Sequence, residues 1–438
     1  MDHDAAKDFF QKPDDWKTVK LRLQEAGLLW REKSVRERIQ IIRRVRHSLR
    51  TNMALIMQLS RRPRSETFTA EILPLMAACR FLERKAASVL RTRKAGLSGA
   101  PLWLFGTQAV VERRPFGAVL ILSPGNYPLL LGGIQTLQGL MAGNAVALKP
   151  APGTRDVLAL FTRILMQSGL PDGIVVLLGE EDGPDAASAG FDLIVLTGSA
   201  KTGRAVAHAA AKTLTPTIME LSGSDAAYIL PGADLDRAAR ALAFAARLNG
   251  GATCIAPRRV FVTADNASRL SAVLKTHLRR SCFGSVVRPF RTISDNLAHL
   301  GAAAYEAGAE VECHGGVTLF AGDGRLAAVL SIDLFEPWIG IIAVRTMDEA
   351  LSLDAACPYA LGASVFGPEN EAGALARLLP VGSVCINDVI LPTADPRLPF
   401  SGTRESGHGV TRGPEGLLAM TRPVSISRRR AFSPHQWL

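Results

Sequence analysis

Apolar residues recur at helical spacing in the first part of the chain. Between residues 15 and 60 they form two sets with charged residues in the gaps. The sets are Val19, Leu21, Leu23, Leu28 and Leu29, followed by Ile39, Ile41, Ile42, Val45 and Leu49. One apolar stripe on an otherwise charged helix is typical of a helix that covers a core. The pattern therefore predicts two amphipathic helices here and a third over residues 66–92.

The pattern changes at Phe116, where short apolar runs begin to alternate with helix-like stretches. The predicted strands are 117–122, 145–148, 174–178 and 193–196, and the predicted helices are 130–142, 154–168 and 202–213. A second series follows from Ala226, with strands at 228–230 and 259–262 and helices at 234–247 and 265–280. Apolar strands alternating with helices indicate parallel sheets wound with crossover helices. Two such series predict two α/β domains.

One apolar stretch raises the question of a membrane span. Residues 115–148 contain no charged side chain, which is long enough to cross a bilayer. Pro124, Asn126, Pro128 and six glycines interrupt it, however, and a broken helix would leave backbone groups unpaired in lipid. The stretch is therefore predicted to be a buried strand, a turn, a helix and a second buried strand, with no membrane anchor.

Composition adds limits on size and partners. The chain has 438 residues, of which 47% are hydrophobic and 21% charged, so it can bury a substantial core in two intimate domains. The net charge of +11 favours a solvated basic surface. The alternative is an acidic partner such as a phosphate-bearing cofactor, a carrier protein or a membrane surface. No basic run is interleaved with aromatic residues, so nucleic acid is not predicted as a partner.

The six cysteines are scattered along the chain. They are Cys79, Cys254, Cys282, Cys313, Cys357 and Cys385. They form no CxxC pair and no metal-ligand spacing, so no metal site is predicted. The start Met1-Asp2-His3-Asp4 lacks the apolar segment of a signal peptide. Free cysteines without such a segment predict a reducing, cytoplasmic environment.

Seven motifs, most of them close to the ends of predicted strands, occur in a distinctive order. They are Ser123-Pro124-Gly125-Asn126-Tyr127-Pro128, residues 143–150 up to Lys149-Pro150, Leu196-Thr197-Gly198-Ser199 with Gly203-Arg204, Met219-Glu220-Leu221-Ser222-Gly223, Asn249-Gly250-Gly251-Ala252-Thr253-Cys254, Leu334-Phe335-Glu336-Pro337, and Leu398-Pro399-Phe400-Ser401-Gly402 with Ser406-Gly407-His408-Gly409. The ordered set resembles the aldehyde dehydrogenase superfamily over about residues 15–425. The short N-terminus and residues 209–220 look most like its compact, dimeric class-three branch.

The resemblance implies an α/β fold with three parts. A Rossmann-like NAD(P)-binding domain would comprise residues 1–96 and 115–224, and an α/β catalytic domain residues 225–412. Residues 97–114, with the strand-like run 102–105, and 413–438 would form a small β oligomerisation arm. In this family such arms build a sheet shared between subunits, and open strand edges favour pairing. A homodimer is therefore expected.

Cys254 is the candidate nucleophile. Oxidation of an aldehyde needs a nucleophile that makes the carbonyl carbon tetrahedral, so that hydride can leave, and a thiolate can later depart from the thioester. Cys254 lies in a glycine-rich turn between a predicted helix and strand, where the backbone can approach a ligand. A lone cysteine is otherwise most often a small buried hydrophobic residue. The resemblance implies a thiohemiacetal and then a thioester on Cys254.

Two further residues would complete the chemistry. By resemblance, the Asn126 side chain and the Cys254 backbone N–H would bind the oxyanion, although an asparagine there could simply cap the next helix. Glu220 would be the base for deacylation, with a pKa raised by burial; its alternative is a solvent-facing residue at a strand end. A base here favours release of a free acid, because relatives that transfer the acyl group to coenzyme A tend to lack it.

The cofactor residues implied by the resemblance lie at strand ends. Lys149 would bind the adenosine ribose, and Ser199 with the following helix N-terminus would face the pyrophosphate. The remaining predicted contacts are Ser123, Pro124, Gly198, Gly203 and Asp333. The 198–203 segment is superficially P-loop-like, but Arg204 and Ala205 replace the Lys-Ser/Thr pair. Pro152 stands where the family often has an acidic residue, so the cofactor is predicted as NAD or NADP without a choice between them.

Several positions depart from the family pattern. Gly125 replaces a usual Trp, Ala252 a usual Gln, and Ser224 a usual Lys, while Asp333 aligns with a usual Glu and Glu336 with a usual Gly. The departures gather around the nicotinamide and substrate. They leave three hypotheses: oxidation of a small-molecule aldehyde, a reductase or transferase acting on carrier-bound acyl thioesters, and a non-catalytic scaffold. The retained Glu220 favours the first.

Overall fold

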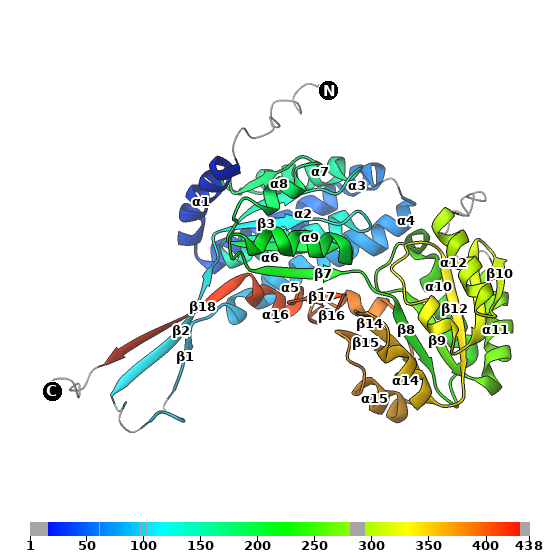
Figure 1. The fold of residues 1–438 in the computed structure, drawn as a ribbon. Coiled ribbons are helices and arrows are strands. Elements are labelled where there is room, and N and C mark those ends of the chain that lie inside the picture. The colour runs from blue at the N-terminus through cyan, green and yellow to red at the C-terminus, as the bar shows by residue number, and fades with distance from the viewer. Residues whose placement is uncertain are drawn as a thin grey trace.

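The computed structural model describes residues 16–429 except 61, 97, 102, 103, 105 and 281–293. It contains two α/β units, each built on a mainly parallel sheet with helices against it, and a narrow antiparallel sheet that projects away from both (Figure 1). Cys282 and the ends of the predicted first domain and arm, residues 1–15 and 430–438, lie outside the described residues.

The first unit contains a six-stranded sheet in the order β17-β7-β6-β3-β4-β5. Its strands are β3 (Ala118–Leu122), β4 (Ala145–Lys149), β5 (Val175–Leu177), β6 (Leu193–Gly198), β7 (Thr217–Leu221) and β17 (Gly407–His408). All pairs are parallel except β17 with β7. Every residue of β3 is buried, as expected for a central strand covered on both faces. The four strands predicted between residues 117 and 196 are confirmed.

Helices enclose this sheet and supply most of its core. They are α1 (Trp16–Glu32), α2 (Val35–Thr51), α3 (Met53–Leu59), α4 (Arg64–Thr67), α5 (Leu73–Val89), α6 (Gly133–Ala142), α7 (Arg155–Gln167), α8 (Gly183–Ala187) and α9 (Ala200–Ala211). The predicted third helix is interrupted: a π-helical turn, Phe68–Ile72, separates α4 from α5. A second π-helical turn, Pro128–Gly132, precedes α6. Residues 115–148 thus fold as the predicted strand, turn, helix and strand.

The second unit contains a seven-stranded sheet in the order β10-β11-β12-β9-β8-β14-β15. Its strands are β8 (Asp225–Ile229), β9 (Pro257–Thr263), β10 (Glu310–His314), β11 (Val317–Asp323), β12 (Trp338–Val344), β14 (Gly362–Phe366) and β15 (Ser383–Ile386). Its helices are α10 (Leu235–Arg247), α11 (Ala264–Arg279), α12 (Asp295–Glu306), α13 (Leu326–Val329), α14 (Met347–Ala355) and α15 (Glu369–Ala376). The strands and helices predicted from Ala226 onward are confirmed.

The projecting sheet joins β1 (Arg93–Lys94), β2 (Thr107–Pro115) and β18 (Thr421–Arg429). β2 and β18 pair along their whole length, from Thr421 opposite Pro115 to Arg429 opposite Thr107. Of the predicted strand-like run 102–105, the described residue Leu104 lies in a 3-10 turn and not in a strand. Helix α16 (Gly413–Ala419) falls in the range predicted for the arm, yet it packs against α5 and α6 of the first unit. A two-stranded sheet, β13 (Tyr359–Ala360) with β16 (Thr403–Arg404), completes the fold.

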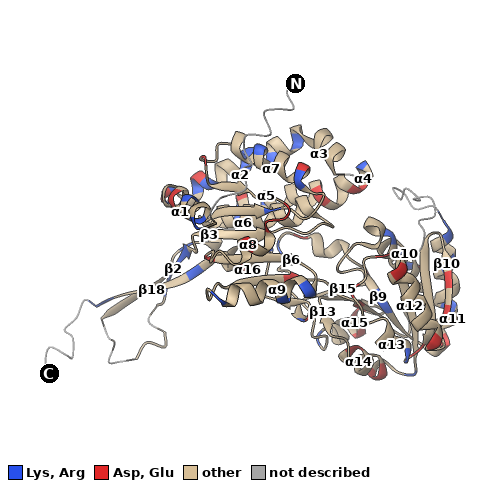
Figure 2. Cartoon of the chain, turned by 45° about the horizontal axis from the view of Figure 1, so that its top comes forward, with Lys and Arg blue, Asp and Glu red and all other residues tan. Residues whose placement is uncertain are grey.

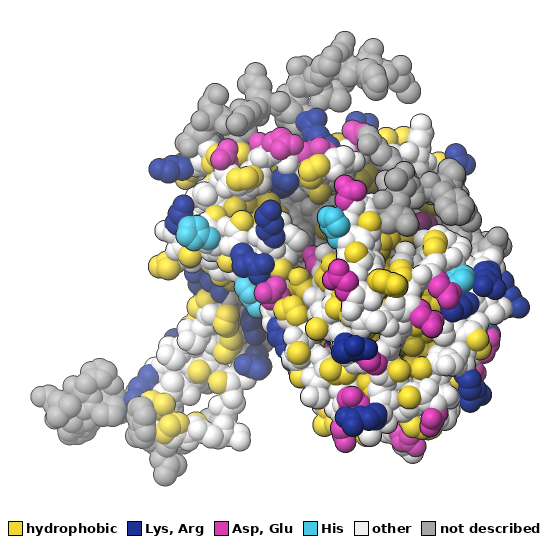
Figure 3. All heavy atoms as spheres, turned by 45° about the vertical axis from the view of Figure 1, so that its right-hand side comes forward, with side chains coloured by type: hydrophobic (Ala, Val, Ile, Leu, Met, Phe, Trp, Pro, Cys, Tyr) yellow, Lys and Arg dark blue, Asp and Glu magenta, His cyan; other side chains and the backbone are white. Residues whose placement is uncertain are grey.

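Charge is dispersed over the molecule. Figure 2 shows Lys and Arg, and Asp and Glu, scattered over the helices of both units. Figure 3 shows both signs interspersed with apolar side chains on one face. This distribution agrees with a solvated surface more than with one large basic patch. Across the described ranges, no helix has the length and apolar character needed to cross a bilayer.

Candidate active site

The Cys254 turn is shaped by glycine. It follows α10 through a 3-10 turn, Leu248–Gly251, and leads into β9. Gly251 has a φ of +85°, and an added Cβ would lie 2.3 Å from the backbone of Glu336. Only glycine combines that φ with such a close backbone approach. The turn therefore brings Gly251, three residues before Cys254, against the loop that carries Glu336.

Asn126 connects its loop, after β3, to the Cys254 turn. Its Nδ2 donates to the Ala252 carbonyl at 3.2 Å, and its Oδ1 accepts from the Tyr127 N–H at 3.0 Å. Asn249 Nδ2 donates back to the Asn126 carbonyl at 3.0 Å. The hydroxyls of Tyr127 and Thr253 are 2.6 Å apart. Asn126 is therefore held beside Cys254 by both loops, which is more than a local helix cap.

Glu220 is buried and not solvent-facing, with 3% of its surface exposed. It lies on β7, and its Oε2 accepts a hydrogen bond from the Thr411 hydroxyl at 2.9 Å. Its Oε1 lies 3.9 Å from an Arg412 nitrogen and accepts no hydrogen bond from any described residue. Burial raises the pKa of Glu220, while Arg412 and Thr411 oppose the rise. The expected direction of this pKa shift is confirmed.

The Cys254 thiol is held in its protonated form. Burial first, and then the charges of Glu220 and Asp225, raise its pKa to about 12, while Arg412 opposes the rise. Because the thiolate is the reactive form, the thiol needs a base to become a nucleophile. Glu220 is the carboxylate whose charge acts most strongly on it.

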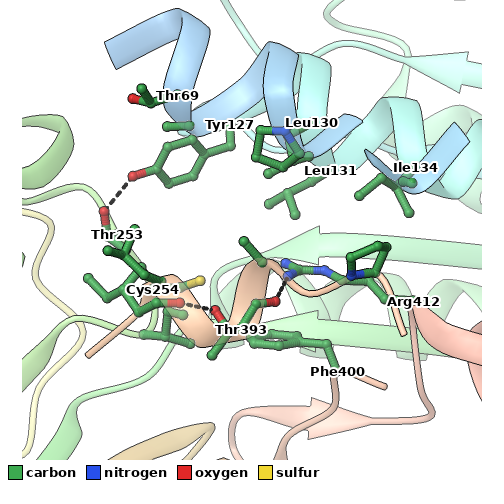
Figure 4. A pocket seen from close by; sticks show the side chains of 18 of the residues that line it. Thr69, Tyr127, Leu130, Leu131, Ile134, Thr253, Cys254, Thr393, Phe400 and Arg412 are labelled. Atoms are coloured by element: carbon green, nitrogen blue, oxygen red, sulfur yellow. Dashed lines mark hydrogen bonds between the residues drawn. The ribbon is translucent and has the colours of Figure 1, made fainter. Parts of the chain in front are cut away.

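Two cavities meet at Cys254. The larger one, about 880 Å³, lies at the carboxyl ends of β3, β4 and β6 and is lined by Lys149, Ser199, Glu220, Cys254 and Asp333, among others. The smaller one, about 150 Å³, lies between α5, α6 and the segment around Leu391–Ala394, with mainly apolar walls. In Figure 4, Leu131 and Ile134 form one wall of the smaller cavity and Arg412 and Phe400 the opposite wall, with the Cys254 sulfur at one end. Cys254 can therefore face a ligand in either cavity.

The residues predicted to bind the cofactor line the larger cavity, with one exception. Those lining it are Ser123, Pro124, Lys149, Gly198, Ser199 and Asp333. Ser199 is the N-cap of α9 and accepts from the Thr202 N–H at 3.2 Å. Gly203 does not line the cavity; an added Cβ would lie 2.5 Å from Leu221, so this glycine permits close helix–strand packing.

The positions that depart from the family pattern lie in or near the site. Gly125 and Ala252 line the larger cavity. Ser224 instead donates to the Leu330 carbonyl at 2.8 Å, away from the cavity. Burial raises the pKa of Asp333, and a hydrogen bond with Ser222 and the charge of Arg258 oppose the rise. In the part of the chain that the structure describes, no group of His, Cys, Asp and Glu could hold a metal ion.

Several residues that hold the site together were not predicted from the sequence. Arg62 donates to the Asn126 carbonyl and pairs with Glu71 at 3.0 Å. Asn249 likewise holds Asn126, while Thr411 and Arg412 hold Glu220. For Thr411 and Arg412 a clue existed, since only Val410 separates them from the Ser406–Gly409 motif.

A parallel sheet with a cavity at the carboxyl ends of its strands is typical of the class of α/β enzymes that bind dinucleotides. The model described as aldehyde dehydrogenase family matches residues 21–426. The chain therefore belongs to the aldehyde dehydrogenase family, and it carries out NAD(P)-dependent oxidation of aldehydes. The acyl-thioester and scaffold hypotheses are not favoured.

Individual relatives agree with this assignment. A protein named 4,4'-diapolycopene aldehyde oxidase from a Methylomonas species is 32% identical, covering 94% of this chain and 81% of its own. An aldehyde dehydrogenase of Mycobacterium tuberculosis complexed with NAD+ has a TM-score of 0.81 at 26% identity, covering 91% of this chain and 86% of that one. An NADP-dependent glyceraldehyde-3-phosphate dehydrogenase from Bacillus halodurans, complexed with NADP, has a TM-score of 0.83 at 26% identity, covering 95% and 91%.

Proposed function

We propose that this chain oxidises extended, apolar aldehydes to carboxylic acids through a thioester on Cys254. The observation that carries the proposal is the position of Cys254, which lines both cavities beside the buried carboxylate of Glu220. The direct test is a single turnover with cofactor and aldehyde, quenched and searched by mass spectrometry for an acyl adduct. An adduct on the peptide that carries Cys254 supports the proposal, and an adduct elsewhere contradicts it.

The larger cavity fits a dinucleotide. The N-terminus of the twelve-residue helix α9 opens there behind its Ser199 cap, and backbone N–H groups at such an end favour phosphate. Lys149, half-buried at the end of β4, would face the adenosine ribose. Asp333 would face the nicotinamide ribose from the opposite loop. When bound, NAD+ or NADP+ supplies the acceptor for the hydride of the substrate.

The chain's own groups then move protons and bind charge. Glu220 takes the thiol proton as Cys254 Sγ attacks the carbonyl carbon. The resulting oxyanion accepts hydrogen bonds from the Cys254 backbone N–H and from Asn126, whose amide has a second N–H besides the one directed at Ala252. Glu220 then releases the thiol proton to solvent, and after hydride loss it takes a proton from water as hydroxide adds to the thioester. The Sγ–C bond breaks to release the acid, and the proton on Glu220 returns to the Cys254 thiolate.

The smaller cavity supports an apolar substrate. Its walls include Phe81, Leu82, Leu130, Leu131 and Ile134. Such a surface gains free energy from each buried methylene and offers few partners to a polar chain. The relative named 4,4'-diapolycopene aldehyde oxidase is consistent with a hydrocarbon-like substrate.

Catalytic efficiency is expected to rise with the length of the aldehyde. Each added methylene buried in the cavity is worth about 0.8 kcal/mol, so kcat/KM should increase about fourfold per carbon from hexanal to decanal. Initial rates of reduced-cofactor formation measure this trend. Decanal with a terminal hydroxyl is the matched control and should lose much of the gain, because its hydroxyl must be desolvated. A flat or falling series would exclude an apolar substrate site.

Replacing Asn126 by alanine should lower kcat by about 10²–10³-fold, because one donor to the oxyanion is lost. The KM for aldehyde should change little, since the donor acts mainly on the charged state of the carbonyl. Steady-state kinetics separate the two effects. Asn266→Ala, on the partly exposed start of α11, is the control. A kcat for Asn126→Ala within twofold of wild type would remove Asn126 from the mechanism.

The assembly and the domain limits remain proposals. A homodimer is supported by the projecting β2–β18 sheet, whose edges could pair with a second copy. The division at residues 224–225, between β7 and β8, separates the two large sheets. A cytoplasmic location and the likeness to the class-three branch stay predictions.

A further inference from the structure

Arg412 brings a buried positive charge into the apolar cavity. Its side chain is only 12% exposed and lines the wall opposite Leu131 (Figure 4). One guanidinium nitrogen donates to the Thr393 carbonyl at 2.9 Å, and the group lies 4.4 Å from the centre of the Phe400 ring. These two contacts fix the plane of the guanidinium. Its other terminal nitrogen is 3.9 Å from Glu220 Oε1.

The backbone at Arg412 is also unusual. Its φ is +59°, a left-handed conformation that residues other than glycine rarely adopt. Strained backbone persists where surrounding contacts fix it, and such positions cluster at functional sites. Here the preceding residue, Thr411, donates to the other oxygen of Glu220. The consecutive residues Thr411 and Arg412 therefore lie one beside each oxygen of the Glu220 carboxylate.

We propose that Arg412 is a positioning residue that holds the Glu220 carboxylate beside Cys254 and balances its negative charge. This proposal rests on the proposed function, in which Glu220 is the base. A carboxylate that must be charged inside an apolar site needs a compensating cation. Arginine suits the position because it stays protonated, stacks on an aromatic ring and directs several N–H groups at once.

The charged and titratable groups around Glu220 decide in which direction loss of Arg412 shifts the pKa values in the site. Cys254 faces it from the turn before β9, Asp225 of β8 acts on the same thiol, and His408 of β17 is hydrogen-bonded to Thr217 at 2.9 Å. Arg412 lowers the pKa of Glu220 and that of the Cys254 thiol. Without it both pKa values rise, less carboxylate and less thiolate exist at neutral pH, and catalysis requires a higher pH.

The test is the pH dependence of kcat for Arg412→Met, with NAD+ and decanal as the probes. The rising limb should move to higher pH by about one unit, so that kcat at pH 7 falls about tenfold and recovers toward the wild-type value as the pH is raised. Arg412→Lys keeps a charge and should restore most of the rate at pH 7.

Controls separate positioning from folding. Arg397→Met removes an exposed arginine from a nearby loop and should keep the wild-type profile. Where Arg412→Met does not fold, as judged by thermal unfolding, Arg412→Gln takes its place, since an amide can still donate to Thr393. A wild-type rising limb in the uncharged variant overturns the proposal. Retained turnover in Cys254→Ser would instead overturn the proposed function, so the two failures are distinguishable.

Discussion

Replacing Cys254 by serine is expected to lower kcat for aldehyde oxidation by about 10⁴-fold or more. A serine hydroxyl in this position is a far weaker acid than the thiol, whose pKa of about 12 is already high. Glu220 could not ionise it to a useful extent, and the oxygen would be a poor leaving group from the acyl intermediate. The rate of reduced-cofactor formation with a saturating aldehyde measures the loss.

Cys313→Ser is the matched control for this change. Cys313 is an exposed cysteine on β10, the edge strand of the second sheet, and it lines neither cavity at Cys254. Its substitution should leave kcat within twofold of wild type. If Cys254→Ser kept more than a tenth of the wild-type rate, or if Cys313→Ser lost activity to the same degree, Cys254 would not be the nucleophile.

Replacing Glu220 by glutamine should lower kcat by about 10²–10⁴-fold, the usual range for loss of a general base. Glutamine has a similar shape and can still accept from Thr411, but it cannot take a proton from water or thiol. Any thioester that forms should persist, because its hydrolysis requires the base. Rapid quenching and mass spectrometry should find a larger acylated fraction of Cys254 than in the wild-type enzyme at steady state.

The pH dependence of kcat for the wild-type enzyme should also depend on the Glu220 carboxylate. Burial raises the pKa of Glu220, and the base form exists only above that pKa, so kcat should rise as the pH passes through it. This rising limb should be absent in Glu220→Gln. Glu405→Gln, which removes a partly exposed carboxylate paired with Arg204, is the control and should keep the limb. A Glu220→Gln enzyme with wild-type turnover would assign the proton transfers to another group.

Two glycines, Gly251 and Gly203, were predicted from the sequence to lie close to a ligand or the cofactor. The glycines before Cys254 predicted a turn whose backbone can approach a ligand, and the structure places Gly251 against the Glu336 backbone instead. Gly203 was predicted to contact the cofactor, but it packs on Leu221 instead. A local motif indicates that something comes close to the backbone. It does not identify whether the neighbour is a ligand or a side chain.

The two α/β units and the turns that carry Cys254 and Asn126 could be predicted from the sequence. These depend on the period of apolar residues and on turn chemistry, which act over a few residues. The surroundings of Cys254, Asn126 and Glu220 could not be predicted, because they depend on how distant segments pack. Thr411 reaches Glu220 from 191 positions away, and the apolar cavity joins helices of the first unit to a loop beyond the second sheet. Such contacts arise when distant segments pack together, and no short stretch of sequence encodes them.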